Sequence, residues 1–263
     1  MPMTQDQDRT VRDDILDPAR LSALAATLGL SGEAIRPFWH QIYFWDAQPG
    51  SKLGVDGHPK TGALIPDMGL PRRMWAGGRL RFHTTPKLSQ TARKSTTLLN
   101  ANRKQGRTGA LGLVTLHHEI SQDGTLLVSE EQDLIYREAD ARSGTPPHAA
   151  TDETEVRSHN FTTTELFRYS ALTFNGHRIH YDRDYARNVE GYDGLVVHGP
   201  LLAQYLMIMA EDLLGGLSAF DFRATAPLLD HQPVIFCAKP VDGGLTLWAR
   251  AEDGRQCMTA TAS

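Results

Sequence analysis

The chain has 263 residues, of which 40% are hydrophobic and 22% charged, so it can bury the core of one large domain or of two small ones. Its formal net charge of −4 argues against a general nucleic-acid binder. Cys237 and Cys257 are too few for a disulfide framework, which fits a reducing compartment. The polar stretch Met1 to Asp14 does not resemble a signal peptide, and the most apolar stretch, Leu201 to Leu214, is too short to span a bilayer. We therefore expect a cytoplasmic protein that binds neither nucleic acid nor a membrane.

Helical signals come first along the chain. Asp17-Pro18 is typical of a helix start, and Gly29 can end that helix. Aromatic and aliphatic residues at helical spacing between Ile35 and Trp45 predict a second helix that packs into the core. Residues 47–78 contain seven glycines and four prolines, so we expect an irregular segment that is functional or covers a partner.

Strand signals replace the helical ones from residue 78 to residue 137. The runs 115–120 and 126–129 flank Gln122-Asp123-Gly124, which predicts a hairpin. Residues 141–157 are rich in Ser, Thr, Pro, Asp and Glu without any periodicity, which indicates a linker.

The second half repeats this combination of helix and strands. The run Pro200 to Leu214 predicts a helix that protein covers on nearly every face and that Gly215-Gly216 ends. Strand-like runs follow it at 220–225, 234–238, 245–249 and 257–261. Because a buried helix and antiparallel strands recur in each half, we predict an α+β fold made of two similar units.

The densest group of reactive side chains lies between Thr173 and Asp182. His177 and His180 are three residues apart with Arg178 between them, and such groups are costly to bury unless their polar atoms are satisfied. Histidine is also the side chain whose free pKa suits proton transfer near neutrality. A turn with a purely structural role would more often use Ser, Asp or Asn, so we interpret this loop as functional.

The segment His198-Gly199-Pro200 leads an apolar run onto the start of the long helix. The N-terminus of a helix has backbone N–H groups without intrahelical partners and carries partial positive charge. Gly199 would let a ligand approach that backbone closely, which indicates a site for an anion or a developing oxyanion. A glycine before a proline is also a common helix start, so this signal is weak by itself.

Ten basic residues and no acidic residue lie between Arg72 and Arg107. This segment fits equally well a face that binds phosphates or an acidic carrier protein, and a solvated edge strand. His117 and His118 are neighbours in a predicted strand, so they point to opposite faces and cannot chelate a metal together. Because the sequence has no zinc motif, no phosphate-binding glycine motif and no nucleophile elbow, we expect no metal, no cofactor and no covalent catalysis.

The stretch from Phe167 to Leu214 resembles the MaoC-like, or hydroxyacyl-thioester dehydratase type 2, superfamily. Members of this superfamily carry Gly-Asp-x-Asn-Pro-x-His and, further along the chain, a His-Gly pair that opens the central helix. The matching residues here are Phe174-Asn175-Gly176-His177-Arg178-Ile179-His180 and His198-Gly199. The stretch from Ser170 to Tyr181 is similar to one branch, which contains fungal mitochondrial type 2 dehydratases and bacterial hydratases of mesaconyl-CoA or itaconyl-derived thioesters. Residues 71–78 are also similar to the N-terminal half of those proteins.

This resemblance implies a double hot dog, in which two antiparallel sheets are each wrapped around a central helix. It implies a degenerate N-terminal half at 1–140, the linker at 141–157 and a catalytic half at 158–263. The catalytic residues implied are His180 for proton transfer, Gly199 as oxyanion donor and Asn175 at the position of the family aspartate. Since Asn175 cannot act as a base, we expect its amide to orient the reacting water.

The implied activity is the reversible hydration of a short-chain enoyl-CoA, in particular a branched dicarboxylic one such as mesaconyl-C4-CoA or itaconyl-CoA on a route of itaconate degradation. The second carboxylate of such a substrate needs a cation, and Arg178 is the nearest one in sequence. The predicted substrate-binding residues are Arg72, Arg73, His177, Arg178 and His198. The alternatives are a thioesterase with Asp182 as base and a non-catalytic module that binds an acyl carrier. The choice between CoA and a carrier protein and the direction of the reaction stay open, and exposed strand edges would allow a homodimer.

Overall fold

The computed structural model describes residues 9–31, 34–106, 109–138 and 144–263. Contacts within these residues divide the chain into two units. The first unit comprises the described residues up to Leu16 and those of Thr61–Thr145, and the second comprises those of Asp17–Lys60 and Pro146–Ser263. The segment 17–60 therefore belongs to the second unit, although it precedes most of the first unit in the sequence. Residues 141–143, at the start of the predicted linker, lie outside the described residues.

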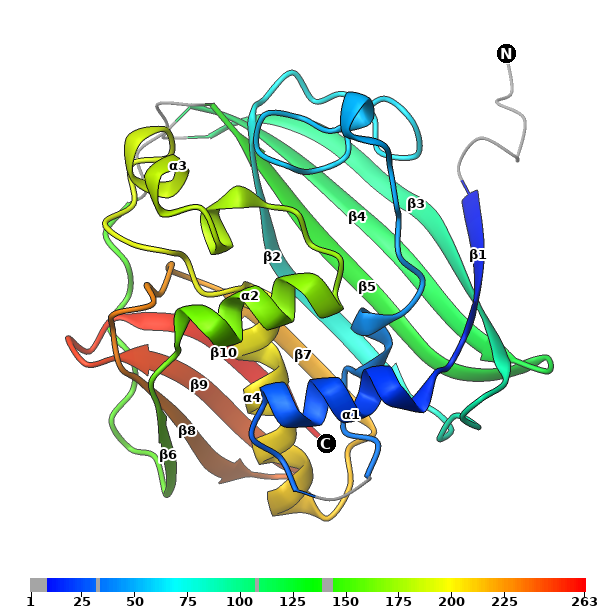
Figure 1. Cartoon of the computed structure of the whole chain (residues 1–263). Helices are drawn as coiled ribbons and strands as arrows, with labels where there is room; N and C mark the ends of the chain where they lie inside the picture. Colours follow the sequence, from blue (N-terminus) through cyan, green and yellow to red (C-terminus); the bar gives the residue numbers. More distant parts are fainter. Residues whose placement is uncertain (1–8, 32–33, 107–108, 139–143) are drawn as a thin grey trace. The chain divides into compact units, whose positions relative to one another are not determined.

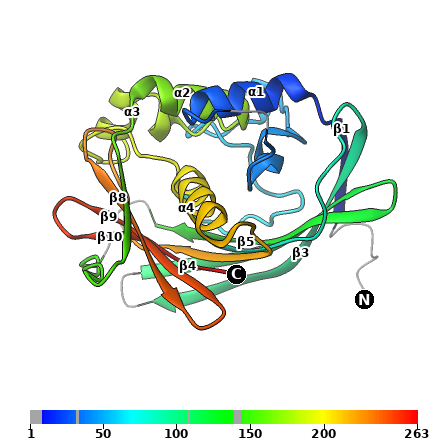
Figure 2. The same ribbon diagram turned by 90° about the horizontal axis from the view of Figure 1, so that it is seen from below.

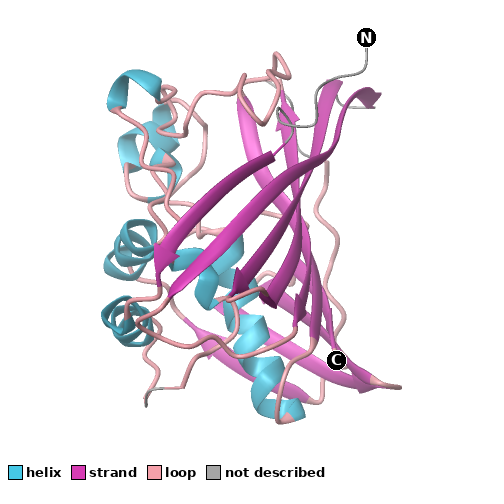
Figure 3. Ribbon diagram, turned by 90° about the vertical axis from the view of Figure 1, so that its right-hand side faces the viewer, coloured by secondary structure: helices cyan, strands magenta, loops and turns pink. Residues whose placement is uncertain are grey.

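The first unit is an antiparallel sheet with the strand order β1-β3-β4-β5-β2. Its strands are β1 (Arg9–Ile15), β2 (Arg72–Phe82), β3 (Thr91–Gly106), β4 (Gly109–Gln122) and β5 (Thr125–Arg137). The predicted hairpin is confirmed, because β4 and β5 are joined by Asp123 and Gly124 with φ values of 49° and 79°. Positive φ at both residues is what the type I′ turn of a two-residue hairpin requires. The strands are visibly twisted in Figure 3.

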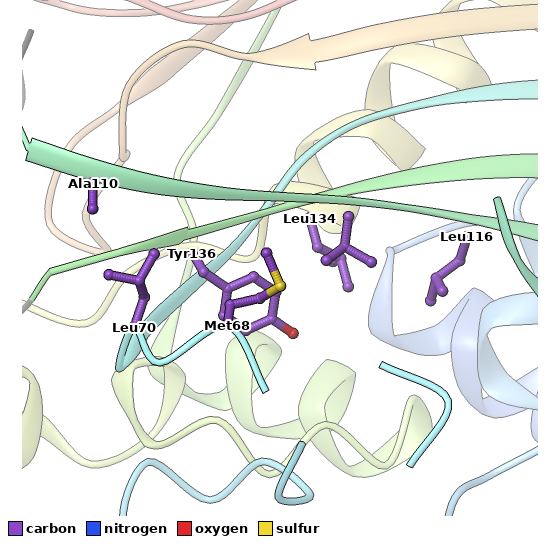
Figure 4. Packing of buried hydrophobic residues seen from close by; sticks show 7 residues of the cluster. Met68, Leu70, Ala110, Leu116, Leu134 and Tyr136 are labelled. Atoms are coloured by element: carbon purple, nitrogen blue, oxygen red, sulfur yellow. The ribbon is translucent and has the colours of Figure 1, made fainter. Parts of the chain in front are cut away.

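The core of the first unit is formed by alternate side chains of β4 and β5 and by the segment that precedes β2. Met68 and Leu70 in that segment pack against the side chains of the two strands (Figure 4). The buried cluster consists of Met68, Leu70, Ala110, Val114, Leu116, Leu134 and Tyr136. No helix lies in this unit within the described residues, so its sheet is covered here by an irregular segment.

The helix predicted from Ile35 to Trp45 is not formed, and the described part of this segment contains only the 3₁₀ turn η1 (Trp39–Ile42). Phe38 and Phe44 have φ values of 70° and 60°, which are left-handed conformations that interrupt a right-handed helix. Four of its aromatic side chains are nevertheless buried, as the sequence predicts for a core segment, and Trp45 is half-buried. Their spacing was misleading because burial here comes from contacts with several elements rather than from one helical face.

The second unit is an antiparallel sheet with the order β7-β10-β9-β8-β6, packed around the helix α4 (Gly199–Leu214). Its strands are β6 (Glu155–His159), β7 (Ala219–Ala224), β8 (Val234–Val241), β9 (Gly244–Ala251) and β10 (Gln256–Ala262). Figure 2 shows α4 beside these strands, and its residues from Leu201 to Ala210 are buried apart from Tyr205. Gly215 ends the helix with a φ of 74°, as predicted. The predicted α+β class is confirmed.

Two shorter helices, α1 (Pro18–Thr27) and α2 (Thr163–Leu172), lie side by side in the second unit (Figure 1). Asp17 caps α1 as predicted, because its carboxylate accepts a hydrogen bond from the Ala19 N–H at 2.9 Å. The remaining short elements are η2 (Gly50–Lys52), η3 (Arg178–His180) and α3 (Arg183–Asn188). None of the helices in the described ranges combines the length and the apolar character needed to cross a membrane.

Candidate active site

His180 lies in the 3₁₀ turn η3, and its ring is buried with 6% of its surface exposed. The ring atom Nδ1 is 2.7 Å from the carbonyl oxygen of Val196. A carbonyl can only accept, so Nδ1 carries the proton and Nε2 keeps its lone pair. Burial lowers the pKa of His180 to about 4, the hydrogen bond to Val196 counteracts this in part, and positive charge on His58 lowers it further. The ring is therefore a neutral imidazole with a defined basic nitrogen near pH 7.

His198 connects this ring to the start of the long helix. The two imidazoles are stacked, with centroids 3.7 Å apart and planes 20° apart. The carbonyl of His198 accepts hydrogen bonds from the N–H groups of Leu201 and Leu202, so His198 occupies the N-cap of α4 and Gly199 is its first residue. Nε2 of His198 pairs with the Ser170 hydroxyl at 2.8 Å, whereas its buried Nδ1 has no partner among the described residues. Burial keeps the pKa of His198 well below its ordinary value.

The low pKa of His180 predicts an unusual pH dependence of catalysis. If neutral His180 is the base, kcat/KM for hydration should be constant across neutral and mildly acidic pH and fall only as the pH approaches about 4. An exposed histidine would lose its base function near 6.5 instead. Initial rates between pH 4 and 8 measure this, and a midpoint near 6.5 would assign the activity to a different, solvated imidazole.

Asn175 shapes the turn before η3. Its side-chain oxygen accepts a hydrogen bond from the backbone N–H of His177 at 3.0 Å, and its backbone N–H donates to the Ser170 carbonyl at 2.8 Å. Phe174 before it adopts a left-handed conformation with φ of 52°. The oxygen of the Asn175 amide is thus engaged in the loop itself. The predicted orientation of water by this residue consequently depends on the amide nitrogen.

Arg178 is held by several groups of the second unit. Its guanidinium forms an ion pair with Asp182 at 2.7 Å, donates to the Val55 carbonyl at 3.2 Å and lies over the Tyr185 ring, 4.2 Å from its centroid. The hydrogen bond and the charge of Asp182 raise the pKa of Arg178. These contacts fasten the segment around Val55 to the loop that carries His180.

Asp56 and His58 were not recognised in the sequence, although the structure brings them beside the predicted residues. Nδ1 of His58 is 3.2 Å from an oxygen of Asp56, and the His58 ring lies 4.3 Å from the ring of His177. The rings of His177 and His180 are in turn nearly perpendicular, with centroids 5.4 Å apart. The only signal in the sequence was the glycine-rich and proline-rich composition of residues 47–78, which indicated a functional segment without naming its residues.

The segments of Asp56 and His177 approach each other through their backbones. A Cβ atom on Gly57 would lie 1.9 Å from the Gly176 carbonyl oxygen, and one on Gly176 would lie 2.7 Å from the Gly57 carbonyl oxygen. Gly57 also has a φ of 89°, which favours glycine. The N–H of Arg178 donates to the Asp56 carbonyl at 2.9 Å. Both glycines are needed for this approach, which sets His58 against His177.

One group of side chains in the described residues has the composition and spacing of a possible metal site. It is the same trio of Asp56, His58 and His177, whose ligand atoms lie within 4.8 Å of one another. Asp56 and His58 already hydrogen bond to each other, so we interpret the trio through proton transfer below. The absence of a metal stays a prediction.

The two predicted substrate-binding residues of the first unit, Arg72 and Arg73, lie at the start of β2. Arg72 is opposite Arg137 and Arg73 is opposite Tyr136 on the neighbouring strand β5. Their role in substrate binding stays a prediction. Within the basic segment, cross-strand partners neutralise part of the charge: Arg79 pairs with Glu131 and Asp133, and Arg93 pairs with Asp13. Arg107 lies outside the described residues.

Comparison with known structures shows the fold. A MaoC-like dehydratase from Phytophthora capsici matches with a TM-score of 0.74 and 10% identity over 98% of this chain and 96% of that one. A protein from Mycobacterium tuberculosis described as having a double hotdog fold matches with a TM-score of 0.58 and 15% identity over 97% and 95% of the two chains. The predicted double hot dog is therefore confirmed, although the helix expected in the first half is replaced by an irregular segment within the described residues.

Comparison of the sequence with known proteins identifies the family. The chain is 41% identical to the mesaconyl-C(4)-CoA hydratase of Chloroflexus aurantiacus over 95% of its own length and 93% of that protein. The model of the family named hydroxyacyl-thioester dehydratase type 2 matches residues 38–230, which include the histidine loop and all of α4. With a buried basic imidazole stacked on the residue that caps its central helix, the chain belongs to the hydroxyacyl-thioester dehydratase type 2 family.

Proposed function

We propose that the protein adds water reversibly across the α,β double bond of a branched dicarboxylic enoyl-CoA, with mesaconyl-C4-CoA as its first candidate substrate. The observation that carries this proposal is the 41% identity to a hydratase of that thioester over nearly the whole chain. Itaconyl-CoA is the second candidate. The link to itaconate degradation is a further prediction from the resemblance, while the cytoplasmic location and the homodimer stay predictions from the composition and from exposed strand edges.

The arrangement around His180 supports a chemical route for this reaction. Nε2 of His180 would take a proton from water as the oxygen attacks the β-carbon, while negative charge develops on the thioester oxygen. The N–H of Gly199 begins α4, where the backbone donors and the helix dipole favour such a charge. The stacking of His180 on His198 brings the base to this end of the helix.

The thioesterase alternative requires a base aimed at the carbonyl carbon. Asp182 was the candidate, but its carboxylate caps α3 by accepting from the Tyr185 N–H at 3.0 Å and pairs with Arg178. The Tyr185 hydrogen bond and the interaction with Arg178 lower the pKa of Asp182. Because both oxygens of this carboxylate are engaged with neighbouring groups of the protein, these contacts support hydration over hydrolysis.

A panel of thioesters tests the proposal. The purified enzyme is given crotonyl-, mesaconyl-C4- and itaconyl-CoA, and the loss of enoyl absorbance is followed beside the release of free thiol. We expect hydration without thiol release and a kcat/KM at least about tenfold higher for mesaconyl-C4-CoA than for crotonyl-CoA. Thiol release at the rate of substrate loss would make the protein a thioesterase, and no turnover of any thioester would remove the proposed function.

Arg178→Gln tests which role this cation has. Because its guanidinium already contacts Asp182 and the Val55 carbonyl, we expect the variant to lower kcat/KM for crotonyl-CoA and mesaconyl-C4-CoA by the same factor. The ratio of the two kcat/KM values is the measurement. A loss confined to the dicarboxylic substrate would instead assign Arg178 to the recognition of the second carboxylate.

A further inference from the structure

Hydration of an enoyl thioester needs two proton transfers, one from water and one to the α-carbon. His180 offers a single basic nitrogen, since its other ring nitrogen is committed to the Val196 carbonyl. Asn175, at the position of the family aspartate, has no proton to exchange. A second titratable group next to His180 would let the two transfers take place at separate groups.

We propose that His177, supported by the Asp56–His58 pair, is the second proton-transfer group of the hydratase and exchanges the proton at the α-carbon while His180 exchanges the proton of water. This inference rests on the proposed function. It assigns a role in catalysis to a segment, residues 54–58, that lies far from the histidine loop in the sequence.

Geometry supports this assignment. The contacts form one series. An Asp56 oxygen is 3.2 Å from Nδ1 of His58, and the centroids of the His58 and His177 rings are 4.3 Å apart. The rings of His177 and His180 are nearly perpendicular, and their centroids are 5.4 Å apart. His177 is 7% exposed, whereas the side chains of Asp56 and His58 are each about one fifth exposed. The series thus leads from a buried base to groups that solvent can reach.

Charge supports it as well. Burial raises the pKa of Asp56, but the hydrogen bond from His58 and positive charge on His58 and His177 outweigh burial and lower it. Asp56 is accordingly a carboxylate at neutral pH. The carboxylate of Asp56 thus places negative charge beside the His58 ring, which in turn packs against the His177 ring.

The proton and electron balance closes over one turnover. Nε2 of His180 takes a proton from water, the water oxygen bonds to the β-carbon, and the π electrons of the double bond move toward the thioester. Protonated His177 gives its proton to the α-carbon, which leaves hydroxyacyl-CoA, protonated His180 and neutral His177. Transfer of the proton from His180 back to His177 restores the starting state, so the net change is the addition of one water.

Asp56→Asn is the first test, because it removes the charge but keeps the shape of the side chain. We expect kcat for mesaconyl-C4-CoA to fall by about 10-fold to 100-fold with little change in KM, and Asp56→Glu to recover most of the loss. Asp193→Asn is the matched control, since Asp193 is also ion-paired but is 80% exposed. Turnover of Asp56→Asn equal to that of Asp193→Asn would overturn the proposal, while an inactive wild type would instead remove the proposed function.

Hydrogen exchange at the α-carbon separates the two histidines. The saturated counterpart of the substrate has no double bond to hydrate, so its exchange in D₂O depends on the α-proton step alone. We expect His177→Gln to abolish this exchange and His180→Gln to abolish hydration while leaving exchange within a few-fold of wild type. The reverse pattern, or no exchange in a wild type that hydrates, would overturn the assignment. Asp56→Asn should slow exchange in the same proportion as hydration, which covers the case of a misfolded His177 variant.

A bound metal is the remaining outcome. If the purified enzyme contains one equivalent of a divalent metal, and chelation abolishes turnover that the metal then restores, the proposal is overturned. Asp56, His58 and His177 would then be ligands rather than proton carriers. Turnover that chelation leaves unchanged supports proton transfer.

Discussion

His180→Gln is expected to lower kcat for hydration by about 10³-fold or more, with the fold intact. General acid–base catalysis by one positioned side chain contributes about 10²-fold to 10⁴-fold. The buried ring has one nitrogen fixed by the Val196 carbonyl, so no other atom of this side chain can take over the basic role. Glutamine can still donate a hydrogen bond to that carbonyl, but it cannot accept a proton.

The measurement is kcat and KM with the preferred thioester, together with a thermal unfolding curve for each variant. His231→Gln is the control, because the side chain of His231 is 48% exposed and lies in the same unit. We expect that control to retain full turnover. Activity of His180→Gln within a few-fold of wild type would exclude His180 from the chemical step.

The same variant should alter how stability depends on pH. The folded state depresses the pKa of His180 from 6.5 to about 4, so between these values the unfolded chain binds more protons than the folded one. The stability that neutral His180 contributes is thus complete above about 6.5 and is lost as the pH falls toward 4. His180→Gln should flatten this part of the curve of unfolding free energy against pH.

Gly199→Ala is expected to lower kcat by about 10²-fold with a smaller effect on KM. A donor that stabilises a developing oxyanion is typically worth about 10²-fold to 10³-fold in kcat, and a methyl group beside the first N–H of α4 would hinder the approach of the thioester oxygen. Alanine is a good helix former, so the helix itself should not be destabilised. The loss should therefore appear in turnover and not in the melting temperature.

Gly216→Ala provides the matched control beyond the other end of α4. A Cβ atom at Gly216 meets nothing within 4 Å, so this variant should behave as wild type. Both variants are compared by kcat, KM and melting temperature. Equal turnover of Gly199→Ala and Gly216→Ala would contradict the expected close approach of the thioester oxygen to the first N–H of α4.

Elements whose signals are local were predicted correctly. The helix α4 is a continuous apolar run with Pro200 near its start and Gly215 at its end, and both signals act through the conformation of one or two residues. The turn between β4 and β5 is similarly fixed by Asp123 and Gly124. The strands that follow α4 were also placed correctly, with boundaries shifted by a few residues.

Elements whose stability comes from their neighbours were missed. The strand β1 has no buried residue from Arg9 to Ile15, and it is held by backbone pairing with β3 and by contacts such as Arg93 with Asp13. Its sequence therefore lacks the apolar alternation that would reveal a strand. The segment around Trp39 has the opposite character, with a helical spacing of aromatic residues that φ values above zero at Phe38 and Phe44 prevent from forming a helix.

The sequence by itself predicted the loop with His180 as a candidate site and placed the helix start at Gly199, because both are short motifs whose residues are close along the chain. The tertiary structure alone decided that Asp56 and His58 join them, since Arg178 and Val55 are hydrogen bonded although they are 123 residues apart. The physical reason is the contact between Gly57 and Gly176, in which two backbones approach as only residues without a side chain allow. Neither glycine indicates its partner in the sequence, so the Asp56–His58 pair beside His177 could be found only from the folded chain.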